Sequence, residues 1–111
     1  MENVKKIKSS GEKIGELLFF KILTESDWEV FKKRFENIYP EFLIILRNYC
    51  PKLTAAEQRL FLLIKLKFNT REISNVLGIS GESVRKSKYR LKKKLNLNKE
   101  NSLEEFIYRF N

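Results

Sequence analysis

The 111-residue chain contains no histidine, and this absence excludes several classes of enzyme and metal site. Without histidine there is no Ser-His-Asp or Cys-His catalytic arrangement, no H-E-x-x-H motif and no zinc finger built from two cysteines and two histidines. The single cysteine, Cys50, also excludes an internal disulfide and a four-cysteine metal site. We therefore expect a protein that is not an enzyme and that needs no metal and no cofactor.

Glycine and long apolar runs are also scarce. The four glycines fit neither G-x-x-x-x-G-K-[ST] nor G-x-G-x-x-G, so no phosphate-cradling loop for a nucleotide is indicated. The longest apolar run, residues 17–23, contains Lys21 and is too short to span a bilayer. Residues 1–10 do not lead into a signal-peptide cleavage pattern. These features predict a cytoplasmic protein without membrane insertion in this segment.

Positive charge is concentrated in one part of the chain, which carries a net charge of +9. Residues 1–50 hold nine basic and eight acidic side chains, whereas residues 51–111 hold fourteen and six. Within the second half, seven cations occupy the ten positions 85–94, with no acid among them. Such a cluster predicts an anionic partner.

The apolar residues indicate an all-α fold, because spacings of three and four recur and no segment alternates with a period of two for long. In the first half we expect three helices, the second capped by Thr24 or Ser26 and followed by a break at Pro40. The predicted apolar faces are Ile14, Leu17, Leu18 and Ile22, then Trp28, Phe31, Phe35 and Ile38, then Phe42, Leu43 and Leu46.

The second half carries clearer signals for helix ends. Thr54 and Glu57 form a capping-box pattern, so a helix is expected to begin at residue 55, with Leu60, Leu63, Ile64 and Phe68 directed inward. A short helix is expected at residues 71–77 after a break at residues 69–70. Gly78 favours the left-handed conformation that ends a helix, and Ser80 is expected to cap a helix from residue 81 to about residue 95. Two helices joined by a tight turn, the second rich in cations, are typical of a helix-turn-helix.

The ordered motifs of residues 51–110 resemble a known family. They are L-T-A-A-E at residues 53–57, R-E-I-S-N-V-L-G-I-S at 71–80, S-V-R at 83–85 and L-K-K-K-L-N-L at 91–97. In order and spacing they resemble the LuxR-type (also called GerE- or NarL-type) helix-turn-helix found at the C-terminus of bacterial sensor-regulator proteins. The resemblance implies a four-helix DNA-binding domain at residues 51–111, preceded by a helical extension or linker at 1–50, that regulates transcription. Departures are Ser74, Ser87 and Lys88, which make the inner side of this motif more polar than is usual.

The helix period places Val84, Leu91 and Leu95 on the buried side of the cationic helix. On the opposite side, the resemblance implies that Arg85, Lys86 and Tyr89 read base edges. The residues assigned to DNA phosphates are Thr70, Arg71, Ser80, Ser83, Lys88, Arg90, Lys92, Lys93 and Lys94. Lys88 is expected to extend its stem along the core before its ammonium group reaches solvent.

A final helix is expected after Ser102, whose sequence to Glu105 matches a capping box. Its apolar face is Leu103, Phe106, Ile107 and Phe110. This face either closes the core or, as the resemblance implies, contributes to a dimer interface. The expected partner is double-stranded DNA, bound by a homodimer, with RNA polymerase as an additional candidate. Two alternatives remain: promoter binding like the fourth region of a sigma factor, and a basic helical module that binds a protein or a membrane surface.

Overall fold

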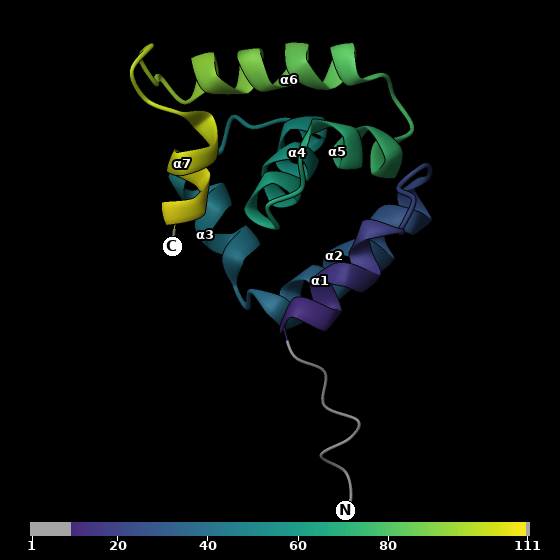
Figure 1. The fold of residues 1–111 in the computed structure, drawn as a ribbon. Helices are drawn as coiled ribbons and strands as arrows, with labels where there is room; N and C mark the ends of the chain where they lie inside the picture. The colour runs from purple at the N-terminus through teal and green to yellow at the C-terminus, as the bar shows by residue number, and fades with distance from the viewer. Residues whose placement is uncertain (1–9, 111) are drawn as a thin grey trace, which may run out of the picture.

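The computed structural model describes residues 10–110, and all regular structure in this range is α-helical. The helices are α1 (Ser10–Leu18), α2 (Glu25–Ile38), α3 (Phe42–Tyr49), α4 (Ala55–Lys65), α5 (Thr70–Leu77), α6 (Gly81–Lys94) and α7 (Leu103–Arg109) (Figure 1). The described range contains no strand, so the prediction of an all-α fold is confirmed. Residues 1–9, which include most of the segment inspected for a signal peptide, and Asn111 lie outside the described residues.

Side-chain caps fix where the helices begin. The Thr54 hydroxyl accepts a hydrogen bond from the Glu57 amide, and the Glu57 carboxylate accepts one from the Thr54 amide, as the sequence pattern predicts. Thr24 caps α2 in the same way, and Asn69 caps α5. Each cap satisfies amide groups that have no partner within the first turn of a helix.

The predicted capping box of α7 is only half formed. The Ser102 hydroxyl accepts a hydrogen bond from the Glu105 amide, but the Glu105 carboxylate lies 3.7 Å from Arg109 Nε, one turn further along the helix. Among the described residues, no hydrogen bond joins the Ser102 amide to the Glu105 carboxylate. Helix α7 begins after Ser102, as the sequence predicts, but its cap has one of the two hydrogen bonds of a capping box.

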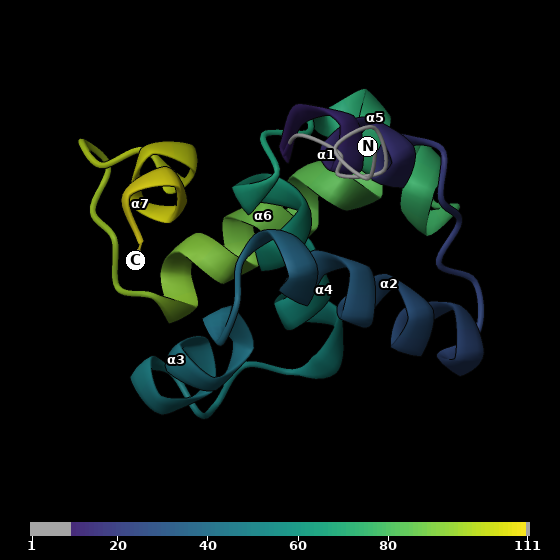
Figure 2. The ribbon, with the colours of Figure 1, turned by 90° about the horizontal axis from the view of Figure 1, so that it is seen from below.

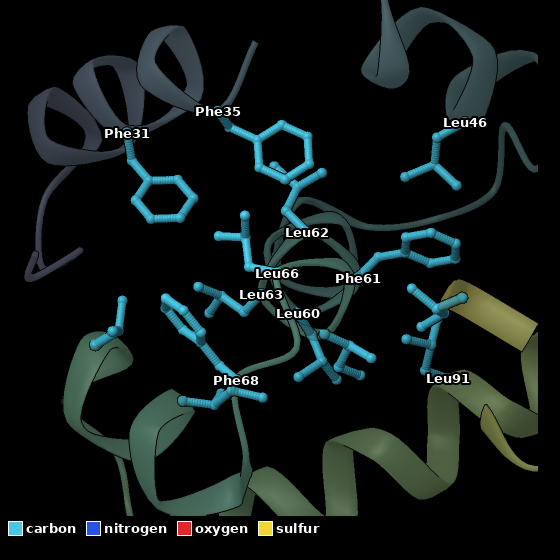
Figure 3. Close-up of a cluster of buried hydrophobic side chains, with 14 of the residues drawn as sticks. Phe31, Phe35, Leu46, Leu60, Phe61, Leu62, Leu63, Leu66, Phe68 and Leu91 are labelled. Carbon is cyan, nitrogen blue, oxygen red and sulfur yellow. The ribbon is translucent and has the colours of Figure 1, made fainter. Parts of the chain in front are cut away.

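Helix α4 is the centre of the fold. Figure 3 looks along α4 and shows Phe31 and Phe35 of α2, Leu46 of α3 and Leu91 of α6 directed toward it from different sides. The predicted inward residues of this segment are buried, but Phe61 and Leu62 on the other sides of α4 are fully buried as well. From Leu60 to Leu66 every residue is buried, so this part of α4 is covered on every side. The single-face prediction for α4 was therefore correct but incomplete.

The first three helices belong to the same hydrophobic core as the last four. The ring of Phe42 in α3 lies 5.9 Å from the ring of Phe61 and 5.7 Å from that of Phe110, centroid to centroid. Figures 1 and 2 show α1 lying beside α2, with both close to the helices of the second half. Residues 10–50 thus form three helices that pack against those of the second half.

The segment between α1 and α2 docks against α5. The amide of Ile22 donates a hydrogen bond to the Val76 carbonyl oxygen over 2.8 Å, and the Lys21 ammonium group binds the Asn75 carbonyl oxygen at the same distance. The prediction that Ile22 belongs to the first helix is wrong, because α1 ends at Leu18. Ile22 is nevertheless buried, since these contacts hold the non-helical segment against α5.

Candidate nucleic-acid interface

The turn between α5 and α6 consists of residues 78–80. Gly78 ends α5 with a φ of 67°, the left-handed conformation that the sequence predicts, and its amide binds the Ser74 carbonyl oxygen over 2.9 Å. The Ser74 hydroxyl donates a hydrogen bond to the Ile79 carbonyl oxygen. The Ser74 side chain thus adds a polar connection across the turn. These contacts fix α6 relative to α5.

Helix α6 lies along one edge of the molecule, with α4 and α5 on one side of it (Figure 1). Val84 and Leu91 are fully buried on that side, and Leu95 follows them into the core just after the helix. The buried side of α6 is therefore the one that the helix period predicts. The side of α6 opposite Val84 and Leu91 is directed away from the core.

Five cationic or aromatic side chains share the exposed side of α6, which we call the outer face: Arg85, Lys86, Tyr89, Arg90 and Lys93. Tyr89 is 62% exposed, and its ring lies 4.9 Å from the Lys93 ammonium nitrogen. Lys86 lies 3.8 Å from the carboxylate of Glu82, one turn earlier. Among the described residues, no carboxylate of another helix pairs with the outer face. The face is therefore a positively charged surface open to a partner.

The beginnings of α5 and α6 lie next to each other. A Cβ atom placed on Gly81 would lie 3.6 Å from a guanidinium nitrogen of Arg85 and 3.8 Å from the methyl carbon of Thr70. Arg71, the residue after Thr70, is exposed. Thr70 is therefore positioned beside the first turn of the outer face, whereas Arg71 lines a hollow with Phe19 and Lys21.

Ser80 and Ser83, at the start of α6, differ in whether the hydroxyl proton can be donated to a partner. Ser80 accepts a hydrogen bond from the Ser83 amide over 3.1 Å and donates one to the Ser83 hydroxyl oxygen over 3.0 Å. The Ser80 hydroxyl proton is thus used within the cap, which differs from its predicted role as a phosphate ligand. Ser83 is exposed and keeps a hydroxyl proton that it can donate to an external acceptor.

The prediction that the ammonium group of Lys88 reaches solvent is wrong. The Lys88 side chain is only 16% exposed, and its ammonium nitrogen lies 3.0 Å from the Thr70 hydroxyl and 3.1 Å from the Glu104 carboxylate. Burial raises the pKa of the Glu104 carboxyl, but hydrogen bonds from its own backbone and from Lys88, and the Lys88 charge, leave it below its usual value. Lys88 therefore connects α5, α6 and α7 inside the protein.

Lys94 is engaged in a similar way. Its ammonium nitrogen lies 2.7 Å from the Glu57 carboxylate and 3.3 Å from the Lys52 carbonyl oxygen. Burial raises the pKa of the Glu57 carboxyl, but hydrogen bonds from Lys94 and Thr54 and the Lys94 charge outweigh this effect and lower it. Glu57 thus caps α4 and holds the end of α6 at once. The assignment of Lys94 to a DNA phosphate does not agree with this internal pairing.

The predicted interface residues of α7 divide into two groups. Leu103 and Ile107 are buried in the core, which is the first of the two alternatives for this face. Phe106 and Phe110 are half-buried, and the Phe110 ring lies 5.1 Å from the Tyr49 ring and 5.4 Å from the Phe61 ring. The face as a whole closes the core, and a role in dimerisation remains a prediction for Phe106 and Phe110 alone.

Among the described residues, no three His, Cys, Asp or Glu side chains gather into a group that could hold a metal ion. No helix in the same range has both the length and the apolar character needed to cross a membrane. No protein-family model, curated protein or solved structure matches this chain.

Proposed function

We propose that this chain binds double-stranded DNA through α6, as a DNA-binding domain of a LuxR-type transcription regulator. The observation that carries the proposal is the outer face: four cations and one tyrosine on the exposed side of a single helix at the edge of the molecule. Arginine, lysine and tyrosine donate hydrogen bonds to phosphate oxygens and to base edges. An anionic polymer with a groove wide enough for a helix is the partner that fits this surface.

The dimensions of α6 suit a major groove. Its 14 residues give a length of about 21 Å, and the major groove is about 12 Å wide, enough to admit one helix. In this arrangement Arg85, Lys86 and Tyr89 read bases, because they lie nearer the N-terminus of α6 than the other outer-face residues. Arg90, Lys92 and Lys93 bind phosphates further along the helix.

The start of α5 provides a second group of phosphate contacts. Arg71 is exposed there, and Thr70 lies close to Arg85 at the first turn of α6. Amide groups at helix N-termini and adjacent hydroxyl groups suit phosphate oxygens. We assign Thr70, Arg71 and Ser83 to the DNA backbone on the N-terminal side of the interface, and we leave Ser80, Lys88 and Lys94 out of it.

A membrane surface is a weaker partner for the same cations. A helix that lies on a membrane buries one apolar side among the lipid headgroups. The apolar residues Val84 and Leu91 of α6 are already buried in the protein core, and Tyr89 is the aromatic residue that remains exposed. The outer face thus supplies charge without the apolar area that membrane binding needs.

The test is a titration of labelled duplex DNA with the full chain, followed by fluorescence anisotropy at several salt concentrations. We expect a slope of log affinity against log salt of about −3 to −4, because about four cations contact phosphates. The double variant Arg85→Glu with Lys93→Glu should lose most of the binding. The matched control, Lys33→Glu with Arg47→Glu, makes the same change of net charge at exposed positions of α2 and α3 and should retain most of it. Equal losses in the two variants, or salt-independent binding, would contradict the proposal.

A further inference from the structure

Helix α6 contains a single acidic residue, Glu82, in its first turn. The Glu82 side chain is 72% exposed and lines the same surface as the outer face, with its carboxylate 3.8 Å from the Lys86 ammonium nitrogen. A carboxylate accepts hydrogen bonds and donates none, and a DNA phosphate repels it. On a surface used only to bind phosphates, Glu82 would weaken binding.

The position of Glu82 limits what it could contact. In a helix-turn-helix, the N-terminal residues of the second helix lie against the base edges. Glu82 precedes Arg85 by three residues, so the two side chains are neighbours on the helix, with Cβ atoms about 5 to 6 Å apart. That spacing corresponds to adjacent or next-adjacent base pairs, which are about 3.4 Å apart along each strand.

The hydrogen-bonding groups of the bases limit which base Glu82 could bind. In the major groove, the amino groups of cytosine and adenine are the hydrogen-bond donors. Adenine also presents its N7 acceptor beside the amino group, which would face the second carboxylate oxygen and repel it. Cytosine presents an amino group without a neighbouring acceptor on the same base. Arginine pairs best with guanine, to which it donates two hydrogen bonds.

On the basis of the proposed DNA binding, we infer that Glu82 is a specificity-determining residue that accepts a hydrogen bond from the amino group of a cytosine. Arg85 reads a guanine within the two neighbouring base pairs. Lys86 offsets part of the carboxylate charge from one turn away, which lets Glu82 approach the groove. The preferred site therefore contains a cytosine and a guanine at fixed spacing.

The first experiment selects bound sequences from random duplex DNA with the wild-type chain and with Glu82→Gln. We expect the wild type to enrich a cytosine near an enriched guanine. Glutamine prefers adenine, so Glu82→Gln should lose the cytosine or replace it with adenine while keeping the guanine. The matched control, Glu36→Gln, makes the same charge change at an exposed position of α2 and should select the wild-type sequence.

The second experiment uses the wild-type chain and alters the DNA. N4-methylcytosine keeps its pairing with guanine but replaces the major-groove hydrogen of the amino group with a methyl group. Placed at the enriched cytosine, it should weaken wild-type binding about 5- to 100-fold, and it should weaken binding by Glu82→Gln less than threefold. Far-UV circular dichroism of the variants checks that their total helical content matches that of the wild type.

Two results would overturn the inference, and they are distinguishable. If the wild type, Glu82→Gln and Glu36→Gln all select one sequence, Glu82 reads no base, while DNA binding by α6 stands. If the wild type enriches no sequence at all, the proposed sequence-specific function fails, and the role of Glu82 fails with it.

Discussion

The ammonium group of Lys65 donates a hydrogen bond to the carbonyl oxygen of Phe110 over 2.8 Å and another to that of Tyr108 over 3.0 Å. Lys65 ends α4 and is 7% exposed, so a buried cation from the central helix binds the last carbonyl groups of α7. Burial lowers the pKa of Lys65, and the nearby charge of Lys67 lowers it further. Because α7 has only seven residues, it depends on such contacts to stay folded.

The first prediction concerns this contact. Lys65→Met keeps the apolar stem but removes the ammonium group, which leaves carbonyl groups at the end of α7 without their partner. We expect the free energy of unfolding to fall by about 1.5 to 3 kcal/mol, the range for hydrogen bonds to a charged group. Urea denaturation measures the change. Lys33→Met, at an exposed position of α2, should change stability by less than about 0.5 kcal/mol, and equal stability of the two variants would contradict the role of Lys65.

The second prediction compares two glycines of the helix-turn-helix. Gly78 has a φ of 67°, and a Cβ atom there would lie 2.8 Å from a methyl carbon of Leu23. Gly78→Ala should therefore lower the free energy of unfolding by about 1 to 2 kcal/mol through backbone strain, because the exposed Leu23 side chain can move aside. Gly81 has ordinary space around it, so Gly81→Ala should leave stability unchanged or raise it by up to about 1 kcal/mol. Thermal denaturation of the two variants side by side tests the contrast.

The parts of the fold that the sequence predicts well are those set by near neighbours along the chain. The caps at Thr24 and Thr54 each join residues three positions apart, and Gly78 acts through its own backbone conformation. The buried side of α6 follows from the helix period alone. The same period predicts that Arg85 lies on the exposed side of α6, where the outer face is found.

The parts that the sequence does not reveal depend on contacts between distant residues. Lys94 and Glu57 are 37 positions apart, Lys88 and Thr70 are 18 apart, and Lys65 and Phe110 are 45 apart. Helix periodicity places a lysine on one side of its helix but does not identify which carboxylate or carbonyl group another helix brings beside it. The local sequence indicates only that Glu57 and Glu104 lie in the first turns of their helices, not which lysine each of them contacts.

The third prediction concerns pH. The pKa of Glu57 is lower in the folded protein than in the unfolded chain, so the unfolded chain takes up a proton first as the pH falls. The stabilisation is therefore present above about pH 4.5 and is lost as the pH falls through the folded value. Glu57→Gln cannot take up this proton. Between pH 7 and about pH 3.5, we expect the variant to lose less stability than the wild type.

Urea denaturation at the two pH values measures this difference. Glu36→Gln removes a carboxyl group from an exposed position of α2 and serves as the control, which should follow the wild type. A loss in Glu57→Gln as large as that of the wild type would mean that the pairing with Lys94 and Thr54 does not depend on the Glu57 charge.

The fourth prediction separates two adjacent lysines of α6 by what they contact. Lys93 belongs to the outer face, whereas the Lys94 ammonium group lies 2.7 Å from the Glu57 carboxylate. If α6 binds DNA as proposed, Lys93→Gln should flatten the slope of log affinity against log salt by about one unit, because one phosphate contact is lost. Lys94→Gln should change that slope by less than about 0.3 and instead lower the free energy of unfolding by up to about 1 kcal/mol, because its effect is within the protein.

Both variants carry the same substitution at neighbouring positions, so each is the control for the other in salt titrations and in urea denaturation. Equal flattening of the slope would show that Lys94 leaves Glu57 when DNA binds, and the division between the outer face and the internal ion pairs would then be wrong.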